Sequence, residues 1–196
     1  MNDISRPRLG VDFGRVIHGA SLDLGGQADT AFLQGTLEEA LASPATEGVY
    51  EVLPALVERF GGQVWIISKC GERVEQRTRR WLDHHDFYAR TGIPVGNLRF
   101  CRRRADKAIH CADLGITHMI DDRLGVHQAL RDLVPHLYLF GWQEQPPPTW
   151  VRHTENWAEV AEAVTADLPP AGSPAPETAR AGARAARPRP ARHRSR

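Results

Sequence analysis

Short apolar runs alternate along the chain with segments in which apolar residues recur at helical spacing. Five runs predict strands because they are four or five residues long and rich in apolar, often β-branched side chains: 9–13, 64–67, 97–101, 117–120 and 136–140. Helical spacing predicts helices over 37–42, 47–60, 72–85, 105–114, 126–133 and 157–168. This alternation predicts an α/β fold, a Rossmann-like three-layer α/β/α sandwich with a parallel sheet of about five strands.

Polar side chains follow three of the predicted strands at the point where each strand ends. Asp12 ends the first run, Ser68 follows the second, and Asp121 and Asp122 follow the fourth. Any one of them could simply cap the next helix. Ligands of open α/β sheets, however, bind beyond the carboxyl ends of the strands. Because one fold would place all four residues along the same edge, we interpret the set as a site.

These residue types suit phosphoryl transfer. A carboxylate can attack phosphorus and carry a covalent intermediate, and the negative charge of the reaction is stabilised by a metal ion, a lysine and hydroxyl donors. Mg²⁺ prefers oxygen ligands and needs only one or two carboxylates from the protein. A receiver-like signalling domain uses similar residues, but its acid pair follows the first strand, whereas the pair here follows a late one.

Four motifs occur in an order that resembles the haloacid dehalogenase superfamily. GVDFGRVI matches the first motif, D-x-D-x-T/V, at Asp12 and Val16, and VWIIS matches the second at Ser68. Lys107 in RRADKAIHCADLG matches the third, and THMIDD matches the acidic fourth. The resemblance covers residues 9–141. It implies a sheet with the first strand near its centre, and a minimal cap.

The resemblance also implies a role for each matched residue. Asp12 would be the nucleophile, Ser68 would donate a hydrogen bond to the phosphoryl group, and Lys107 would neutralise the oxygens of both. The implied cofactor is Mg²⁺, held by Asp12, Asp121, Asp122 and the backbone carbonyl of Gly14. The family's activity predicts a Mg²⁺-dependent hydrolase that acts on a small phosphorylated molecule. We add Gly14, Arg15 and Lys69 as expected substrate-binding residues.

The sequence departs from the family at Gly14, where phosphatases carry the second aspartate of the first motif. That aspartate acts as general acid and base, a function typically worth about 10²–10⁴ in rate. Another group or solvent could supply the proton. Alternatively, the chain could be a catalytically impaired binding module that keeps the fold. The residues do not choose among nucleotide, sugar phosphate and phosphoprotein substrates.

Composition bounds the organisation of the chain. At 196 residues, with 41% hydrophobic and 25% charged residues, it fits one globular domain rather than a fibrous or disordered protein. We expect a domain over 1–167, with 18–46 as a short cap or insert. The 25 basic residues nearly balance 24 acidic ones, but seven arginines and one glutamate lie in 168–196. We therefore expect a net acidic domain with a disordered Pro/Ala/Arg-rich tail.

The same features predict the surroundings of the protein. Three irregularly spaced cysteines form neither a disulfide framework nor a zinc pattern. No apolar run has the length of a signal peptide or of the ~20-residue span that crosses a bilayer. We expect a cytoplasmic protein with no membrane partner, and contact with nucleic acid only through the Arg-rich tail.

Overall fold

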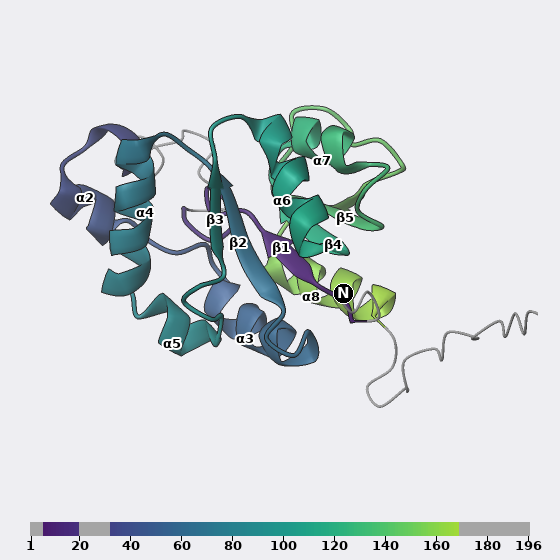
Figure 1. Cartoon of the computed structure of the whole chain (residues 1–196), viewed down its shortest axis with the longest axis horizontal. Coiled ribbons are helices and arrows are strands. Elements are labelled where there is room, and N and C mark those ends of the chain that lie inside the picture. Colours follow the sequence, from purple (N-terminus) through teal and green to yellow (C-terminus); the bar gives the residue numbers. More distant parts are fainter. Residues whose placement is uncertain (1–5, 20–31, 169–196) are drawn as a thin grey trace, which may run out of the picture.

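The central element of the structure is a sheet of six parallel strands. The computed structural model describes residues 6–19 and 32–168, and its sheet has the strand order β3-β2-β1-β4-β5-β6 (Figure 1). The strands are β1 (Leu9–Val11), β2 (Val64–Lys69), β3 (Leu98–Cys101), β4 (His118–Asp121), β5 (His136–Phe140) and β6 (Arg152–Thr154). The parallel sheet and the central first strand are confirmed. The sixth strand, β6, is an addition to the five predicted ones.

Helices cover both faces of the sheet, as the three-layer prediction requires. They are α2 (Leu37–Ala42), α3 (Val49–Arg59), α4 (Glu72–His84), α5 (Phe87–Thr91), α6 (Lys107–Leu114), α7 (Leu124–Leu130) and α8 (Trp157–Asp167). Figure 1 shows α3 and α8 on one face and α6 and α7 on the other, while α2 and α4 stand together at one end. Successive side chains along a strand point to opposite faces of the sheet and pack into two separate cores. Ile66 packs into the core beneath α3 and α8, and its neighbour Ile67 into the core beneath α6 and α7.

Strand β1 places Asp12 at the carboxyl edge of the sheet. All three of its residues are buried, and β1 pairs with β2 on one side and β4 on the other. The amide of Asp12 continues this ladder by donating to the carbonyl of Ile120 at 2.9 Å. A Cβ atom at Gly10 would lie only 2.6 Å from Met119 Sδ, so glycine allows Met119 to pack closely over β1. Asp12 is therefore held by the most buried part of the sheet.

Several boundaries differ from the predicted ones in ways that matter for the site. Strand β2 continues to Lys69, because Ser68 and Lys69 pair with β3, so Ser68 lies inside the strand. The helix expected from residue 105 begins with a short 3₁₀ turn, η1 (Arg104–Asp106), and Lys107 is the first α-helical residue. These shifts move no residue away from the carboxyl edge.

Two predicted segments lie partly outside the described residues. They are the cap, of which residues 20–31 are not described, and the tail, of which 169–196 are not described. Within the described ranges, no helix is long and apolar enough to cross a bilayer. The three cysteines are buried and free.

The buried imidazole of His118 in β4 predicts an acid-sensitive contribution to stability. Burial, together with neighbouring His136, lowers the pKa of His118 from 6.5 to about 3. Unfolded chains therefore take up a proton at this residue first, and stability falls as pH drops below 6.5. The variant His118→Phe keeps a ring against His136 but cannot take up a proton. We expect its free energy of unfolding, relative to that of the wild type, to be roughly 2 kcal/mol higher at pH 4.5 than at pH 7.5.

Urea unfolding at the two pH values measures this difference. The matched control is His84→Phe, because His84 is exposed at the end of α4. An equal effect of His118→Phe at both pH values would show that protonation of His118 is not what destabilises the fold in acid.

Candidate functional site

A buried lysine joins the two strands at the centre of the candidate site. Lys107 Nζ lies 2.6 Å from Asp12 Oδ1 and 2.6 Å from Asp121 Oδ2. The side chain of Lys107 is only 2% exposed, and that of Asp121 is fully buried. Its position as the first residue of α6 sends the ammonium group toward the ends of β1 and β4. Lys107 thus forms one charge network with Asp12, which is 95 positions away in the chain, and with Asp121, which is 14 positions away.

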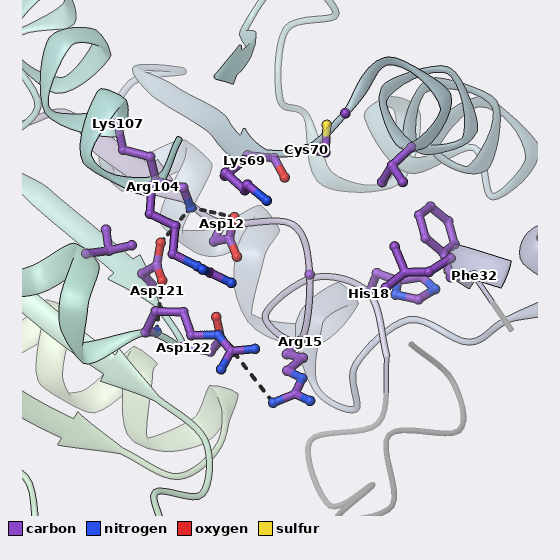
Figure 2. Close-up of a pocket in the computed structure, with 17 residues that line it drawn as sticks. Asp12, Arg15, His18, Phe32, Lys69, Cys70, Arg104, Lys107, Asp121 and Asp122 are labelled. Atoms are coloured by element: carbon purple, nitrogen blue, oxygen red, sulfur yellow. Dashed lines mark hydrogen bonds and ion pairs between the residues drawn. The ribbon is translucent and has the colours of Figure 1, made fainter. Parts of the chain in front are cut away.

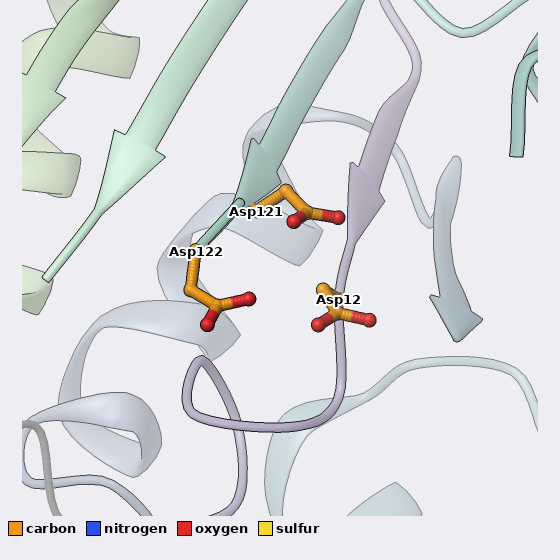
Figure 3. Close-up of side chains that lie close together, drawn as sticks. All are labelled: Asp12, Asp121 and Asp122. Atoms are coloured by element: carbon orange, nitrogen blue, oxygen red, sulfur yellow. The ribbon is translucent and has the colours of Figure 1, made fainter. Parts of the chain in front are cut away.

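Three carboxylates converge beside this lysine. Asp12, Asp121 and Asp122 each offer an oxygen, and these oxygens all lie within 4.8 Å of one another (Figure 3). The pKa of Asp12 is raised to about 6, mainly by burial. The positive charge of Lys107 opposes this rise, and the negative charge of Asp121 adds to it. Burial likewise raises the pKa of Asp122 to about 7, with repulsion from the other two carboxylates. An added cation would relieve this crowding of negative charge.

The charge on Lys107 is secure despite its burial. Burial on its own would lower the pKa of Lys107, but the carboxylates of Asp12 and Asp121 together raise it above its usual range. A lysine in this setting stays protonated and acts as a fixed positive charge rather than as a base.

The donor set of the three carboxylates fits Mg²⁺. All three donors are hard oxygen atoms, which Mg²⁺ and Ca²⁺ prefer, and no cysteine or histidine belongs to the group. Among the described residues, this is the one cluster of three or more side chains able to hold a metal ion. Lys107 engages one oxygen of Asp12, and Arg123 Nε lies 3.1 Å from one oxygen of Asp122. The second carboxylate oxygen of Asp12 and that of Asp122 are therefore available to a metal ion.

A pocket of about 260 Å³ opens over the carboxylates (Figure 2). All eight residues expected to form the site line it: Asp12, Gly14, Arg15, Ser68, Lys69, Lys107, Asp121 and Asp122. Its volume is at the small end for ligand sites, which suits a small molecule. The structure thus brings together residues from β2 and β4, the loops that follow β1 and β4, and the start of α6.

Two arginines flank Asp122. Arg123, the next residue, was not among the expected site residues, although its position directly after the acid pair is a usable signal. Arg15 Nη1 lies more distantly, 4.0 Å from Asp122 Oδ2. Arg15 has a left-handed backbone with φ of 63° in the tight turn that follows β1, where its amide donates to the carbonyl of His18. The turn brings the Arg15 side chain back over the pocket (Figure 2).

An apolar wall on the other side of the pocket was not expected from the sequence. Phe32, Leu33 and Val74 line it. Val74 is on α4, and Arg77, buried on the same helix, holds the segment that carries the other two: its guanidinium donates to the carbonyls of Phe32 at 2.6 Å and Gly35 at 2.5 Å. Thr78, Trp81 and Leu82 are buried on the same helix, and the helical spacing of apolar residues over 72–85 gives no reason to bury an arginine beside them.

The comparisons with known proteins establish the fold. No protein-family model and no curated protein matches the chain. The chain is similar in structure to a haloacid dehalogenase-like family hydrolase from Xanthomonas campestris, with a TM-score of 0.57 and 12% sequence identity. The match covers 82% of this chain and 95% of that one. The chain therefore has a Rossmann-like α/β fold that matches the fold of that protein.

The crowded carboxylates predict a stability that depends on pH and metal. The pKa of Asp122 rises from 3.8 in the unfolded chain to about 7 in the folded one, so the folded state loses stability as pH rises between these values. At pH 8 in EDTA, we expect Asp122→Asn to stabilise the protein by roughly 1 to 2 kcal/mol. At pH 4 we expect no gain.

Thermal unfolding with and without Mg²⁺ measures both effects. Millimolar Mg²⁺ should raise the melting temperature of the wild type at pH 8 and have less effect on Asp122→Asn, since one ligand is weakened. Asp113→Asn, which removes an exposed carboxylate from α6, is the matched control. Equal Mg²⁺ effects on all three proteins would contradict a metal site at Asp122.

Proposed function

We propose that the protein is a Mg²⁺-dependent hydrolase of small phosphate esters that uses Asp12 as a covalent nucleophile. The observation that carries this proposal is the bridge from Lys107 Nζ to Asp12 and Asp121 on the floor of the pocket, next to three converging carboxylates. This arrangement offers a nucleophile and fixed positive charge within one small cavity. The likeness to a haloacid dehalogenase-like hydrolase supports the same class of reaction.

The proposed reaction has two steps. In the first, an oxygen of Asp12 forms a bond to phosphorus while the bond from phosphorus to the ester oxygen breaks, and the alcohol leaves after gaining a proton. In the second, water attacks the phosphorus of the aspartyl-phosphate, which releases inorganic phosphate and restores Asp12. Lys107 donates to Oδ1 of Asp12 and so fixes the orientation of the carboxylate at the floor of the pocket.

Other residues of the pocket would stabilise the charge of the reaction. Lys107 stays positive next to the reacting carboxylate. Ser68 and Lys69 line the pocket from β2, the strand that pairs with β1, and would offer a hydroxyl and an ammonium group. Mg²⁺, held by Asp12, Asp121 and Asp122 with the Gly14 carbonyl, would offset negative charge on the phosphoryl oxygens. The wall formed by Phe32, Leu33 and Val74 would contact the rest of the substrate.

Gly14 is the observation that favours the second candidate, a binding module without turnover. It lines the pocket where the family's phosphatases carry the general acid, and its missing side chain leaves open space: a Cβ atom there would meet nothing within 4 Å. As a hydrolase, the protein would have to take the leaving-group proton from solvent or from a group other than residue 14. It should then favour esters whose alcohols leave readily without protonation.

Loss of the nucleophile tests the hydrolase directly. With Mg²⁺ and a panel of small phosphate esters, we expect Asp12→Asn to lower kcat/KM by at least about 10³-fold, because the amide cannot form the aspartyl-phosphate. Phosphate release measures the rate, and Asp113→Asn controls for the loss of a carboxylate elsewhere. A panel on which the wild type turns over no faster than Asp12→Asn would favour the binding module.

The open space at Gly14 allows a gain-of-function test. Its backbone is not left-handed, so Gly14→Asp is sterically permitted. We expect the new carboxyl group to raise kcat for alkyl phosphates about tenfold or more, since their leaving groups need a proton, and to change aryl phosphates little. Gly14→Asn, of the same shape but unable to donate a carboxylic proton, should show no such gain. Equal rates for all three proteins on alkyl phosphates would mean that another group already serves as the acid.

A further inference from the structure

The four arginines from β3 to η1 divide into three paired residues and one that has no partner among the described residues. The paired ones are Arg99 with the carbonyl of Gly96, Arg102 with Glu75 and Arg103 with Asp106. Arg104 makes no hydrogen bond or ion pair with any described residue, yet it lines the pocket. Figure 2 shows its guanidinium extending over the carboxylates from η1. The fold thus points one arginine of this cluster into the site.

Lys69 is the second pocket cation with no partner among the described residues. The carboxylates of Asp12 and Asp121 are met by Lys107, and that of Asp122 is met by Arg123 and, more distantly, Arg15. The pocket therefore has two positive charges beyond those that face its own acids. Figure 2 shows Lys69 and Arg104 both directed into the cavity above Asp12.

We propose that Arg104, assisted by Lys69, binds a second anionic group of the substrate. The preferred substrates are then phosphate esters that carry another phosphate or a carboxylate. This inference rests on the proposed function, because it assumes that one phosphoryl group lies against Asp12 and Lys107. The planar guanidinium fork of arginine matches both phosphate and carboxylate oxygens.

The position of Arg104 explains how the second group would be selected. η1 leads directly into α6, so Arg104 is three residues before Lys107 and stands at the mouth of the pocket while Lys107 is on its floor. Across the cavity, the wall of Phe32, Leu33 and Val74 offers apolar side chains and no charge for an anion. A substrate with charge at both ends is therefore fixed in one orientation, with its second anion toward Arg104.

Matched substrates separate the second anion from the first. We would compare butyl phosphate with butane-1,4-diol bisphosphate and with 4-(phosphonooxy)butanoate, which share a four-carbon chain, and then vary the chain length. The wild type should show about tenfold higher kcat/KM for at least one of the two compounds that carry a second anionic group. The rate for the bisphosphate is first divided by two, because either of its ends can react. The better of the two identifies the second group as phosphate or carboxylate.

Two neighbouring arginines supply the test variant and its control. Arg104→Met should lose the preference, measured as the ratio of kcat/KM for the ester with two anionic groups to kcat/KM for butyl phosphate. Arg103→Met should retain this ratio, because Arg103 is exposed and faces Asp106. The preference of the wild type should also shrink as ionic strength rises. The inference is overturned if Arg104→Met retains the preference. It is also overturned if the wild type shows no preference at any chain length.

Binding without turnover distinguishes this inference from the proposed function. Calorimetry in Mg²⁺ would compare butylphosphonate with butane-1,4-bisphosphonate and 4-phosphonobutanoate, which the protein cannot hydrolyse. Tighter binding of a compound with two anionic groups that disappears in Arg104→Met supports the role of Arg104 even if no ester is turned over. Turnover of esters without any preference would leave the hydrolase standing and reject the role of Arg104. Absence of binding by all the phosphonates, without turnover, rejects both.

Discussion

The ammonium group of Lys107, buried between Asp12 and Asp121, is the interaction on which the site depends. Removing charges from water is costly, and such a cluster is stable only when every member has a partner at close range. The two 2.6 Å contacts meet this condition and fix the first turn of α6 against the ends of β1 and β4. They also set the direction of η1, and with it the place of Arg104. A single cation thus determines the geometry of both the floor and the mouth of the pocket.

The rest of the fold supplies the rigidity that this cluster needs. Two cores, one on each face of the sheet, hold β1 and β4 from both sides. Against that support, three acids lie close together with only partial compensation, so that Asp12 and Asp122 hold their protons at a higher pH than ordinary carboxyl groups. The energetic cost falls at one edge of the sheet, where a cation and a charged ligand would offset it. Such a division between a stable scaffold and a strained edge is typical of ligand-binding α/β proteins.

Much of the fold could be predicted from the sequence, because apolar runs and helical spacing report directly on burial. The five strand runs and the carboxyl-edge position of Asp12, Ser68 and Asp121 followed from that pattern alone. β6 escaped because Arg152–Thr154 has no apolar run, and α5 because it is five residues long and follows a left-handed Asp86. Arg104 could not be separated from its neighbours, since only the positions of Glu75 and Asp106 in space decide which arginines are paired. The wall at Phe32 depends on Arg77, for which spacing offers no signal.

Arg77 holds the segment from Phe32 to Gly35 through main-chain carbonyls and not through side chains. These two hydrogen bonds therefore do not involve the side chains of that segment. Leu33, which is 46% exposed, can be exchanged for larger, smaller or polar residues while the anchor stays in place, and each exchange would reshape one side of the cavity without disturbing Asp12 or Lys107. Phe32 is instead buried against Phe13 and His18, so its ring belongs to the core as well as to the wall. One wall of the cavity is thus carried by a segment distant in the chain from Asp12 and Lys107, and its exposed position can vary without any change at the reacting residues.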